Sequence, residues 1–390
     1  MNGSYASSPR KPSVMLLIRN LSGGGAELVV ANLFAGLDRE RFDVCVCELS
    51  GRGERAEALS ESGFQNVVSL DPEGRRLSIV GRLRKLRRLR RLMIDRRVCV
   101  VHTHSTDALA DAAIIKLSRP SIRLIHTFHF GNYPNTSAMV LRLERMFHRF
   151  ADQLVAVGHA QAEAIARTYA IQATAMEVIW NGIQLRAPQI DHARFGAYLH
   201  SGKVLIGTIG TLIPQKGHAD LIVVAKEIKR RRLPAMFLVV GSGPLQDELE
   251  SEVRRAGVED TVIFVGWVRD AATTILPALD VFYQPSRWEA MSMVLLEAAA
   301  AGKAIVCTAV GEADRIIENG RTGIVVQPGD HAAMVDALER LVLDEKLRAR
   351  LGRAAQRDVA SRCSADQMVA AYTALYSRIL RHEQRGEAPA

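Results

Sequence analysis

Cysteine pairs and long apolar runs are both missing from this sequence. Its 390 residues include five cysteines, and none of them forms a Cys-x-x-Cys pair or stands with histidines at zinc-ligand spacing. A chain of this length needs no disulfide framework, so we expect a reducing compartment. The N-terminal apolar run 14–18 is too short for the core of a signal peptide or for a membrane span. We therefore expect a cytoplasmic protein, attached at most to a membrane surface.

Proline is scarce as well, with 13 residues against 29 glycines, and apolar residues make up 48% of the chain. This composition excludes collagen-like and disordered proteins and is typical of a globular protein. Short runs rich in Val, Ile and Leu recur at helix-length intervals, which predicts parallel strands joined by helices. The predicted strands are 14–18, 42–49, 98–102, 122–128, 153–157 and 177–180, and then 204–209, 235–240, 262–265, 281–284, 304–307 and 323–326.

Two strand sets of similar size predict an α/β fold with two Rossmann-like domains, whose parallel sheets face each other across a cleft. We expect an N-terminal domain over 13–185, a polar linker over 186–202 and a C-terminal domain over 203–364. A last helix, 365–382, is expected to dock back on the N-terminal domain. Ligands bind such sheets at the carboxyl ends of the strands, so the loops that follow the strands should form the site.

The first predicted strand runs into a glycine loop that contains Gly23, Gly24 and Gly25. Glycines let the backbone approach a ligand closely, and free N–H groups at a helix start attract phosphate. The spacing is not Gly-x-Gly-x-x-Gly, and no acidic residue follows about 20 positions later as a ribose partner. The loop is therefore equally well explained as a phosphate-binding loop or as a tight turn.

In the second half, Gly207 and Gly210 flank the end of a strand, and Lys216-Gly217 opens a helix. The helix dipole disfavours a cation at this position, so Lys216 predicts an anion held beside it. A solvated surface lysine is the plainer alternative.

Two carboxylates, Glu289 and Glu297, stand eight positions apart, on the loop after a predicted strand and on the helix that follows. Paired carboxylates first suggest glycoside hydrolysis, which places them about 5–9.5 Å apart, whereas eight helical residues span about 12 Å. The spacing disfavours hydrolysis and suits two groups that bind separate hydroxyls of one extended sugar nucleotide. A surface glutamate and a capping glutamate would be the plainer interpretation.

The order of these motifs resembles that of retaining glycosyltransferase family 4, which has the GT-B fold. The resemblance extends from about residue 14 to residue 330 and depends above all on Lys216, Glu289 and Glu297. Three further segments fit the same order: Thr127-Phe128-His129, Asn181-Gly182-Ile183 and Gly241-Ser242-Gly243-Pro244.

The resemblance implies that the C-terminal half binds a UDP- or GDP-sugar. Lys216 would neutralise the diphosphate, Glu289 would hold hydroxyls of the transferred sugar, and Glu297 would hold the ribose. His129 matches the family's histidine near the reacting carbon, so the implied catalytic residues are His129, Glu289 and Lys216. The implied donor-binding residues are Gly24, Gly25, Gly210, Thr211, Lys216, Gly243, Gly266, Trp267, Glu289, Met291, Ser292, Met293, Val294 and Glu297.

One position departs from the family pattern. Thr211 stands where the family usually has an arginine, five residues before the lysine, so one of two positive charges on the diphosphate is missing. Losing a charge-assisted contact typically costs about 1.5–3 kcal/mol. The resemblance further implies front-face transfer with no protein nucleophile, no metal and no cofactor beyond the donor, and the sequence contains no Asp-x-Asp cluster.

Positive charge is concentrated in one segment. The chain carries +9, but eleven basic residues against a single acid, Asp95, lie between Arg75 and Arg97, which leaves the rest at −1. Apolar residues at spacings of three and four predict a helix with an apolar stripe and a cationic remainder. Each basic residue of such a helix contributes about 1 kcal/mol to binding an anionic membrane. The predicted membrane-binding residues are Arg82, Arg84, Lys85, Arg87, Arg88, Arg90 and Arg91.

Two other interpretations of this helix are weaker. A core-packing helix with a solvated face usually mixes charges of both signs. Nucleic-acid binding ranks last because no aromatic residues are interleaved with the basic ones.

Together these features predict a retaining, metal-independent hexosyltransferase on the inner face of the cytoplasmic membrane. It would transfer sugar from a nucleotide sugar to a lipid-linked saccharide or a precursor of a surface polysaccharide such as lipopolysaccharide. Two alternatives stay open: a sugar-nucleotide epimerase of the same fold, and a catalytically impaired, membrane-associated partner subunit, which Thr211 motivates. The expected partners are the donor, the acceptor and an anionic membrane, without nucleic acid.

Overall fold

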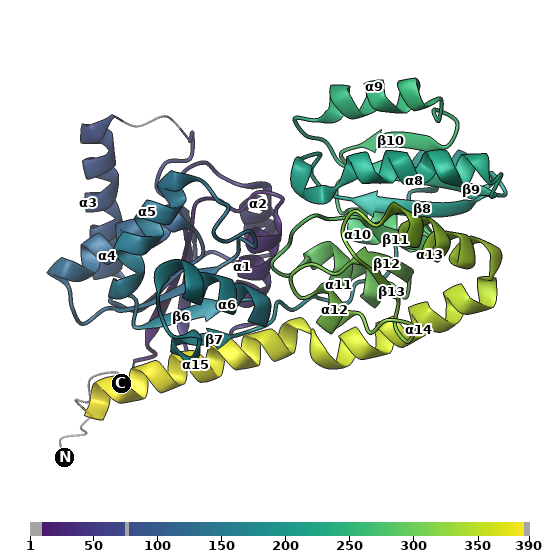
Figure 1. Cartoon of the computed structure of the whole chain (residues 1–390). Coiled ribbons are helices and arrows are strands. Elements are labelled where there is room, and N and C mark those ends of the chain that lie inside the picture. Colours follow the sequence, from purple (N-terminus) through teal and green to yellow (C-terminus); the bar gives the residue numbers. More distant parts are fainter. Residues whose placement is uncertain (1–9, 75–77, 386–390) are drawn as a thin grey trace, which may run out of the picture. The chain divides into compact units, whose positions relative to one another are not determined.

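The computed structural model describes residues 10–74 and 78–385 (Figure 1). The chain forms two compact units. Unit 1 comprises the described residues within 10–129, 133–182 and 365–385, and unit 2 comprises residues 130–132 and 183–364. Each unit contains one parallel sheet with helices between its strands. The predicted α/β class with two Rossmann-like domains is therefore confirmed.

The sheet of unit 1 has seven strands in the order β3-β2-β1-β4-β5-β6-β7. The interior strand β1 pairs in parallel with β2 on one side and with β4 on the other, and all six of its residues are buried. A strand covered on both faces requires such a continuous apolar run. The strands are β1 (Ser13–Ile18), β2 (Asp43–Glu48), β3 (Val67–Ser69), β4 (Val98–Thr103), β5 (Arg123–Phe128), β6 (Gln153–Ala156) and β7 (Met176–Val178).

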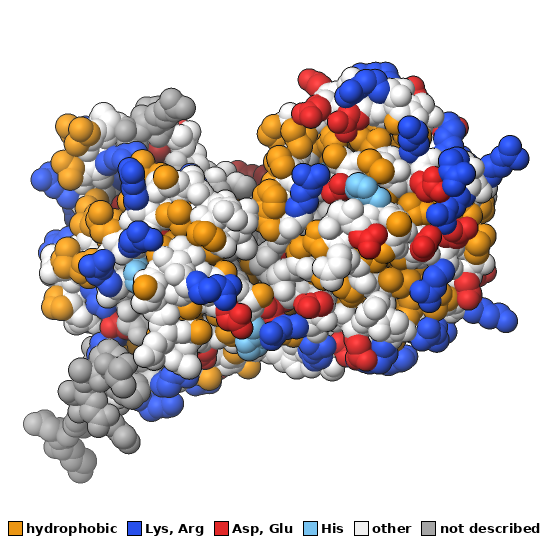
Figure 2. All heavy atoms as spheres, viewed as in Figure 1, with side chains coloured by type: hydrophobic (Ala, Val, Ile, Leu, Met, Phe, Trp, Pro, Cys, Tyr) orange, Lys and Arg blue, Asp and Glu red, His pale blue; other side chains and the backbone are white. Residues whose placement is uncertain are grey.

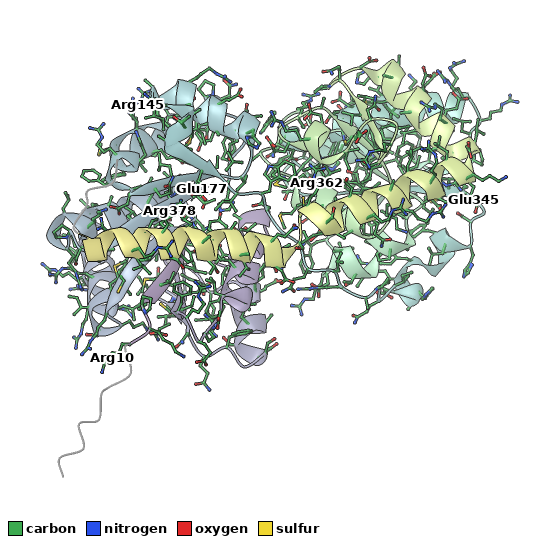
Figure 3. All side chains as sticks on the ribbon, turned by 90° about the horizontal axis from the view of Figure 1, so that it is seen from below. Arg10, Arg145, Glu177, Glu345, Arg362 and Arg378 are labelled. Atoms are coloured by element: carbon green, nitrogen blue, oxygen red, sulfur yellow. The ribbon has the colours of Figure 1, made fainter. Side chains whose placement is uncertain are left out.

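The helices of unit 1 include one from the C-terminal end of the chain. Helix α15 packs on α1 and buries Tyr372 and Tyr376 completely, while its Arg378 pairs with Glu177 of β7 (Figure 3). The helices are α1 (Gly25–Gly36), α2 (Glu54–Glu61), α3 (Ile79–Asp95), α4 (Thr106–Ser118), α5 (Ala138–Phe147), α6 (His159–Tyr169) and α15 (Ala365–Arg385), with the 3₁₀ turns η1 (His148–Phe150) and η2 (Ala173–Ala175).

The sheet of unit 2 has six strands in the order β10-β9-β8-β11-β12-β13. Strand β8 pairs with β9 and with β11, so the strand order reverses between β8 and β11. Ligands of open parallel sheets bind where the strand order reverses. The strands are β8 (Val204–Ile209), β9 (Ala235–Val240), β10 (Val262–Gly266), β11 (Val281–Gln284), β12 (Ala304–Thr308) and β13 (Ile324–Val326).

Four helices of unit 2, α8, α9, α13 and α14, form one apolar core together with the strands of this sheet. The helices of the unit are α7 (His192–Leu199), α8 (His218–Arg230), α9 (Gln246–Ala256), α10 (Ala271–Thr274), α11 (Met293–Ala300), α12 (Ala313–Ile316), α13 (His331–Leu343) and α14 (Glu345–Arg362), with the 3₁₀ turns η3 (Pro214–Lys216) and η4 (Leu276–Ala278).

The structure differs from the sequence prediction at two places. The segment expected as an irregular linker, 186–202, contains helix α7, which Asp191 caps and which buries Phe195. Its backbone bonds to unit 2 at Thr273 and Thr274, so this segment belongs to that unit. The edge strand β3 was missed because its three residues are only half-buried and form no apolar run.

Across the described ranges, no helix has both the length and the apolar character needed to cross a membrane.

Candidate functional site

The loop after β8 places Lys216 at the point where the strand order of unit 2 reverses. Gly217 turns the chain from η3 into α8 with φ +68°, and a Cβ on it would lie 1.9 Å from the carbonyl oxygen of Pro285. Only glycine therefore fits there. The Arg287 N–H donates to the Gln215 carbonyl oxygen at 2.8 Å, which ties this loop to the loop after β11.

Glu289 lies in the loop after β11 and is 8% exposed. Its Oε1 lies 2.6 Å from Lys216 Nζ and accepts from Ser286 Oγ at 2.9 Å, while its Oε2 accepts from Gln215 Nε2 at 3.1 Å. A buried carboxylate needs such partners. Lys216 thus has an internal counter-ion, which the sequence argument for a bound anion did not foresee. Gln215 and Ser286 were missed, although both stand within three positions of a predicted site residue.

The rest of this predicted segment leads into α11. Ser292 caps the helix by accepting from the Leu295 N–H at 3.3 Å, and its hydroxyl donates to Gln284 Oε1 at 2.7 Å. The loop that holds Glu289 is thereby fastened to the end of β11. The remaining predicted residues here are buried or half-buried: Met291, Met293, Val294 and Glu297.

Glycines bring the loops after β8 and β9 into backbone contact. A Cβ on Gly241, which has φ +137°, would lie 2.0 Å from the Gly210 carbonyl oxygen, and one on Gly243 would lie 2.6 Å from Leu212 N. Gly210 in turn lies beside the Lys216 side chain. The other predicted donor-binding residues of these loops are Thr211, which is exposed, Gly266, which ends β10, and Trp267, which is 53% exposed.

His218, the first residue of α8, is a buried histidine that sequence reasoning passed over. It is 3% exposed, and neither ring nitrogen has a hydrogen-bond partner within the described part of the chain. Burial, together with the charge of Lys216, lowers the pKa of His218 to about 4, so the ring is neutral at pH 7.

In unit 1 the glycine loop lies between β1 and α1, and its Gly24 and Gly25 are exposed. Helix α1 begins at Gly25 without a side-chain cap. Glu48 at the end of β2 anchors the start of this loop. Its Oε1 accepts from Leu21 N at 2.8 Å and from Gly53 N at 2.9 Å. Burial raises the pKa of Glu48. No sequence motif pointed to Glu48.

Histidines gather at the carboxyl ends of β4 and β5. The Nδ1 atom of His102 lies 2.7 Å from Tyr376 Oη, and its Nε2 atom lies 2.7 Å from Thr127 Oγ1. His126 Nδ1 bonds to Thr103 Oγ1 at 2.9 Å. The predicted His129 is half-buried and follows β5 directly. Burial lowers the pKa of His126 to about 3 and that of His129 to about 4.

The predicted site residues are thus divided between the units. Lys216, Glu289 and Glu297 belong to unit 2, whereas Gly24 and Gly25 belong to unit 1 with His129. Within the described residues, no group of three or more His, Cys, Asp or Glu side chains is placed to hold a metal ion.

The cationic segment forms helix α3, as its periodicity predicted. Six of the seven predicted membrane-binding residues are exposed: Arg82, Arg84, Arg87, Arg88, Arg90 and Arg91. Lys85 differs, because it is half-buried and its Nζ lies 3.1 Å from Asp111 of α4. Arg75 and Arg76 lie outside the described residues.

The apolar stripe of α3 is divided along its length. Leu89 and Met93 are buried, whereas Ile79, Val80 and Leu83 are 79%, 57% and 53% exposed. Over α3, Figure 2 shows hydrophobic side chains next to Lys and Arg side chains. The first half of the helix therefore presents apolar and cationic groups together to solvent.

Comparisons with known proteins cover both units. The family model described as "Glycosyltransferase Family 4" matches residues 23–187, and "Glycosyl transferases group 1" matches residues 190–358. The UDP-Gal:alpha-D-GlcNAc-diphosphoundecaprenol alpha-1,3-galactosyltransferase of Escherichia coli is 25% identical over 339 residues, which are 83% of this chain and 86% of that protein. The 2-deoxystreptamine N-acetyl-D-glucosaminyltransferase of Streptomyces fradiae is 25% identical over 374 residues, 90% and 87% of the two chains.

Among solved structures, Anabaena HepE in complex with UDP and glucose has the same fold. Its TM-score is 0.81 at 21% identity, and the match covers 94% of this chain and 100% of HepE.

Proposed function

Because the chain belongs to the glycosyltransferases, with a family 4 and a group 1 region that together have the GT-B fold, we propose that it is a retaining enzyme using a UDP- or GDP-sugar. Its acceptor in this proposal is a lipid-linked saccharide or a precursor of a surface polysaccharide. The observation that carries the proposal is the Lys216–Glu289 pair at the strand reversal of unit 2.

The pair suits a sugar nucleotide because it offers one cation and one carboxylate side by side. Lys216 Nζ can bind a diphosphate oxygen, and Glu289 can accept hydrogen bonds from sugar hydroxyls. Ser286 and Gln215 hold the Glu289 carboxylate in place before the donor binds. Glu297 on α11 is assigned to the ribose and Trp267 to the base.

The proposed transfer needs no protein nucleophile. The bond from the anomeric carbon to the diphosphate breaks as the acceptor hydroxyl attacks from the same face, and the acceptor proton passes to the leaving diphosphate. Lys216 and the N–H groups at the start of α8 stabilise the negative charge that grows on that diphosphate. We propose that this positive charge comes from the protein and that the enzyme works without a metal.

The acceptor class is supported by the Escherichia coli relative, whose name specifies a diphosphoundecaprenol-linked acceptor sugar. The cationic face of α3 supports the same class, since such an acceptor resides in a membrane. HepE binds UDP and glucose, which supports a uridine diphosphate sugar as the first donor to test.

Transfer activity tests the proposal directly. We expect one UDP- or GDP-sugar of a panel to raise the melting temperature, because a ligand at about 100 times its Kd adds about 2.7 kcal/mol to the unfolding free energy. Incubation of that donor with polyprenyl-diphosphate-linked sugars should yield a product with the anomeric configuration of the donor, and EDTA should leave the rate unchanged.

Other outcomes would distinguish the alternatives. Conversion of the donor without an acceptor indicates an epimerase, and the absence of binding to every donor indicates an impaired partner subunit. A product of inverted configuration, or loss of activity in EDTA that added metal restores, would contradict the retaining, metal-independent mechanism.

We also propose that α3 attaches the protein to an anionic membrane surface. Six exposed arginines supply the charge, and Ile79, Val80 and Leu83 can enter the boundary between headgroups and acyl chains. Lys85 is left out of this surface because it is half-buried and pairs with Asp111.

Flotation with liposomes measures this attachment. Changing Arg84, Arg87 and Arg91 to Gln should weaken binding to anionic vesicles by about 3 kcal/mol, which is on the order of 100-fold. The matched control changes Arg350, Arg353 and Arg357 on α14, which are exposed at the same i, i+3, i+7 spacing. Equal binding to neutral and anionic vesicles, or equal loss in both variants, would contradict electrostatic attachment through α3.

A further inference from the structure

Two histidine rings of unit 1 are joined by a hydrogen bond at the end of its sheet. His104 follows β4 directly, His129 follows β5 directly, and His104 Nδ1 lies 3.0 Å from His129 Nε2. The planes of the two rings are inclined by 29°, and their centroids lie 5.3 Å apart. The backbone N–H of His104 donates to the Leu17 carbonyl oxygen at 2.9 Å. The neighbouring strand β1 therefore anchors the backbone that carries this ring.

The surroundings of His104 decide which ring donates. His104 is 3% exposed, and its Nε2 is buried with no hydrogen-bond partner among the residues that the structure describes. If the His104 proton were on Nε2, this buried N–H would be left without a hydrogen bond, which is unfavourable. With the proton on Nδ1, only a lone pair is left buried, and buried unsatisfied N–H groups are the rarer of the two in proteins.

A doubly protonated His104 does not fit this position either. Burial and the neighbouring rings of His102, His129 and His126 lower the pKa of His104 well below its usual value. The next ring, His102, already uses both its nitrogens on Tyr376 and Thr127, and its centroid lies 4.0 Å from that of His104. His104 is therefore neutral, with its proton directed at His129.

From this geometry we infer that His104 is a positioning residue, which donates through Nδ1–H to His129 Nε2 and thereby fixes His129 in the tautomer protonated at Nδ1. His129 then meets a ligand as a neutral donor through Nδ1–H, because its Nε2 lone pair is occupied. The functional part of this inference rests on the proposed function, in which His129 contacts the transferred sugar. There it donates a hydrogen bond to a sugar oxygen and does not accept the acceptor proton.

Nitrogen-15 NMR of the full-length protein labelled at histidine reads this tautomer directly. His129 is assigned by the signals that disappear in His129→Gln. We expect a protonated, pyrrole-type nitrogen at Nδ1 and an unprotonated, pyridine-type nitrogen at Nε2 near pH 7. A His129 protonated at Nε2 would overturn the inference.

Two variants separate the hydrogen bond from packing. His104→Asn keeps an N–H donor close to the position of Nδ1, whereas His104→Leu keeps a similar volume without a donor. We expect His104→Asn to preserve the His129 tautomer and His104→Leu to lose it, with a fall in kcat/KM of about 10-fold in His104→Leu alone. An unchanged His129 spectrum in a folded His104→Leu would also overturn the inference. If that variant does not fold, the wild-type spectrum decides.

The NMR result does not depend on catalysis. A wild-type protein with His129 protonated at Nδ1 but with no transferase activity would support the role of His104 and reject the proposed function. An active enzyme whose His129 is protonated at Nε2 would do the reverse.

Discussion

Replacing Glu289 by Gln is expected to lower sugar transfer by about 10²–10³-fold, the effect typical of removing one preorganised polar group from an active site. Glutamine keeps the shape of the side chain but loses the charge that accepts from Lys216 Nζ and Ser286 Oγ. Lys216 is then left without its counter-ion, which destabilises the fold by about 1–3 kcal/mol. Initial rates at saturating donor, with melting curves of both proteins, measure the two effects separately.

Glu227→Gln is the matched control. Glu227 lies on α8 and accepts from Arg230 and Arg231, so the substitution also removes a carboxylate from ion pairs within unit 2. We expect transfer to stay within about 2-fold of wild type, because ion pairs that solvent reaches contribute little to stability. Full activity of Glu289→Gln, or equal losses in the two variants, would contradict the assignment of the site.

Mild acid is expected to destabilise unit 1 more than unit 2. Burial lowers the pKa of His126 to about 3 and that of His129 to about 4, so both rings are neutral in the folded state while the unfolded chain binds protons below about pH 6.5. The unfolded state is thereby favoured as the pH falls, by about 1.4 kcal/mol per pH unit for each ring. His102 and His104, whose pKa values burial also lowers, add to the same loss.

We therefore expect the buried histidines to cost unit 1 about 3 kcal/mol or more between about pH 6 and pH 5, a large part of the 5–15 kcal/mol typical of a folded domain. The raised pKa of Glu48 acts in the opposite direction and offsets part of this loss. Unit 2 has one such ring, His218, and should lose about 1.4 kcal/mol from it over the same interval. Hydrogen exchange, corrected for the intrinsic effect of pH, gives the stability of each unit from its own peptides.

His218→Leu provides the internal control. It should remove the contribution of His218 from the pH dependence of unit 2. The pH dependence of unit 1 should stay unchanged, because His126 and His129, which cause it, are not altered. Equal stability of unit 1 at the two pH values would show that its histidines are not held neutral by the fold.

Much of the architecture follows from local pattern alone. Strand β9 is a continuous apolar run and β8 is nearly one, and the observed bounds of both agree with the predicted ones. Such strands can be recognised in the sequence because a strand covered on both faces is apolar along most of its length. Where burial is partial the signal disappears, so β3 was missed and α7 was taken for part of a linker.

Local sequence pattern predicts the chemistry of the site only in part. The sequence singled out Lys216 and Glu289 separately, each in a loop after a strand, and the order of motifs led to the family. The sequence did not predict that these two side chains pair, because they stand 73 positions apart and meet only when β8 and β11 lie side by side.

Distance along the chain also separates the other features that the sequence predicted from those that it did not. The amino-acid pattern was enough for the two-domain class, for the glycosyltransferase family and for the cationic helix, because each depends on short motifs and on their order along the chain. Tertiary structure alone decided that Lys85 faces Asp111, that Glu48 holds the glycine loop, and that His104 meets His129. Those contacts join separate strands and helices, and their partners are set by how the sheet orders its strands.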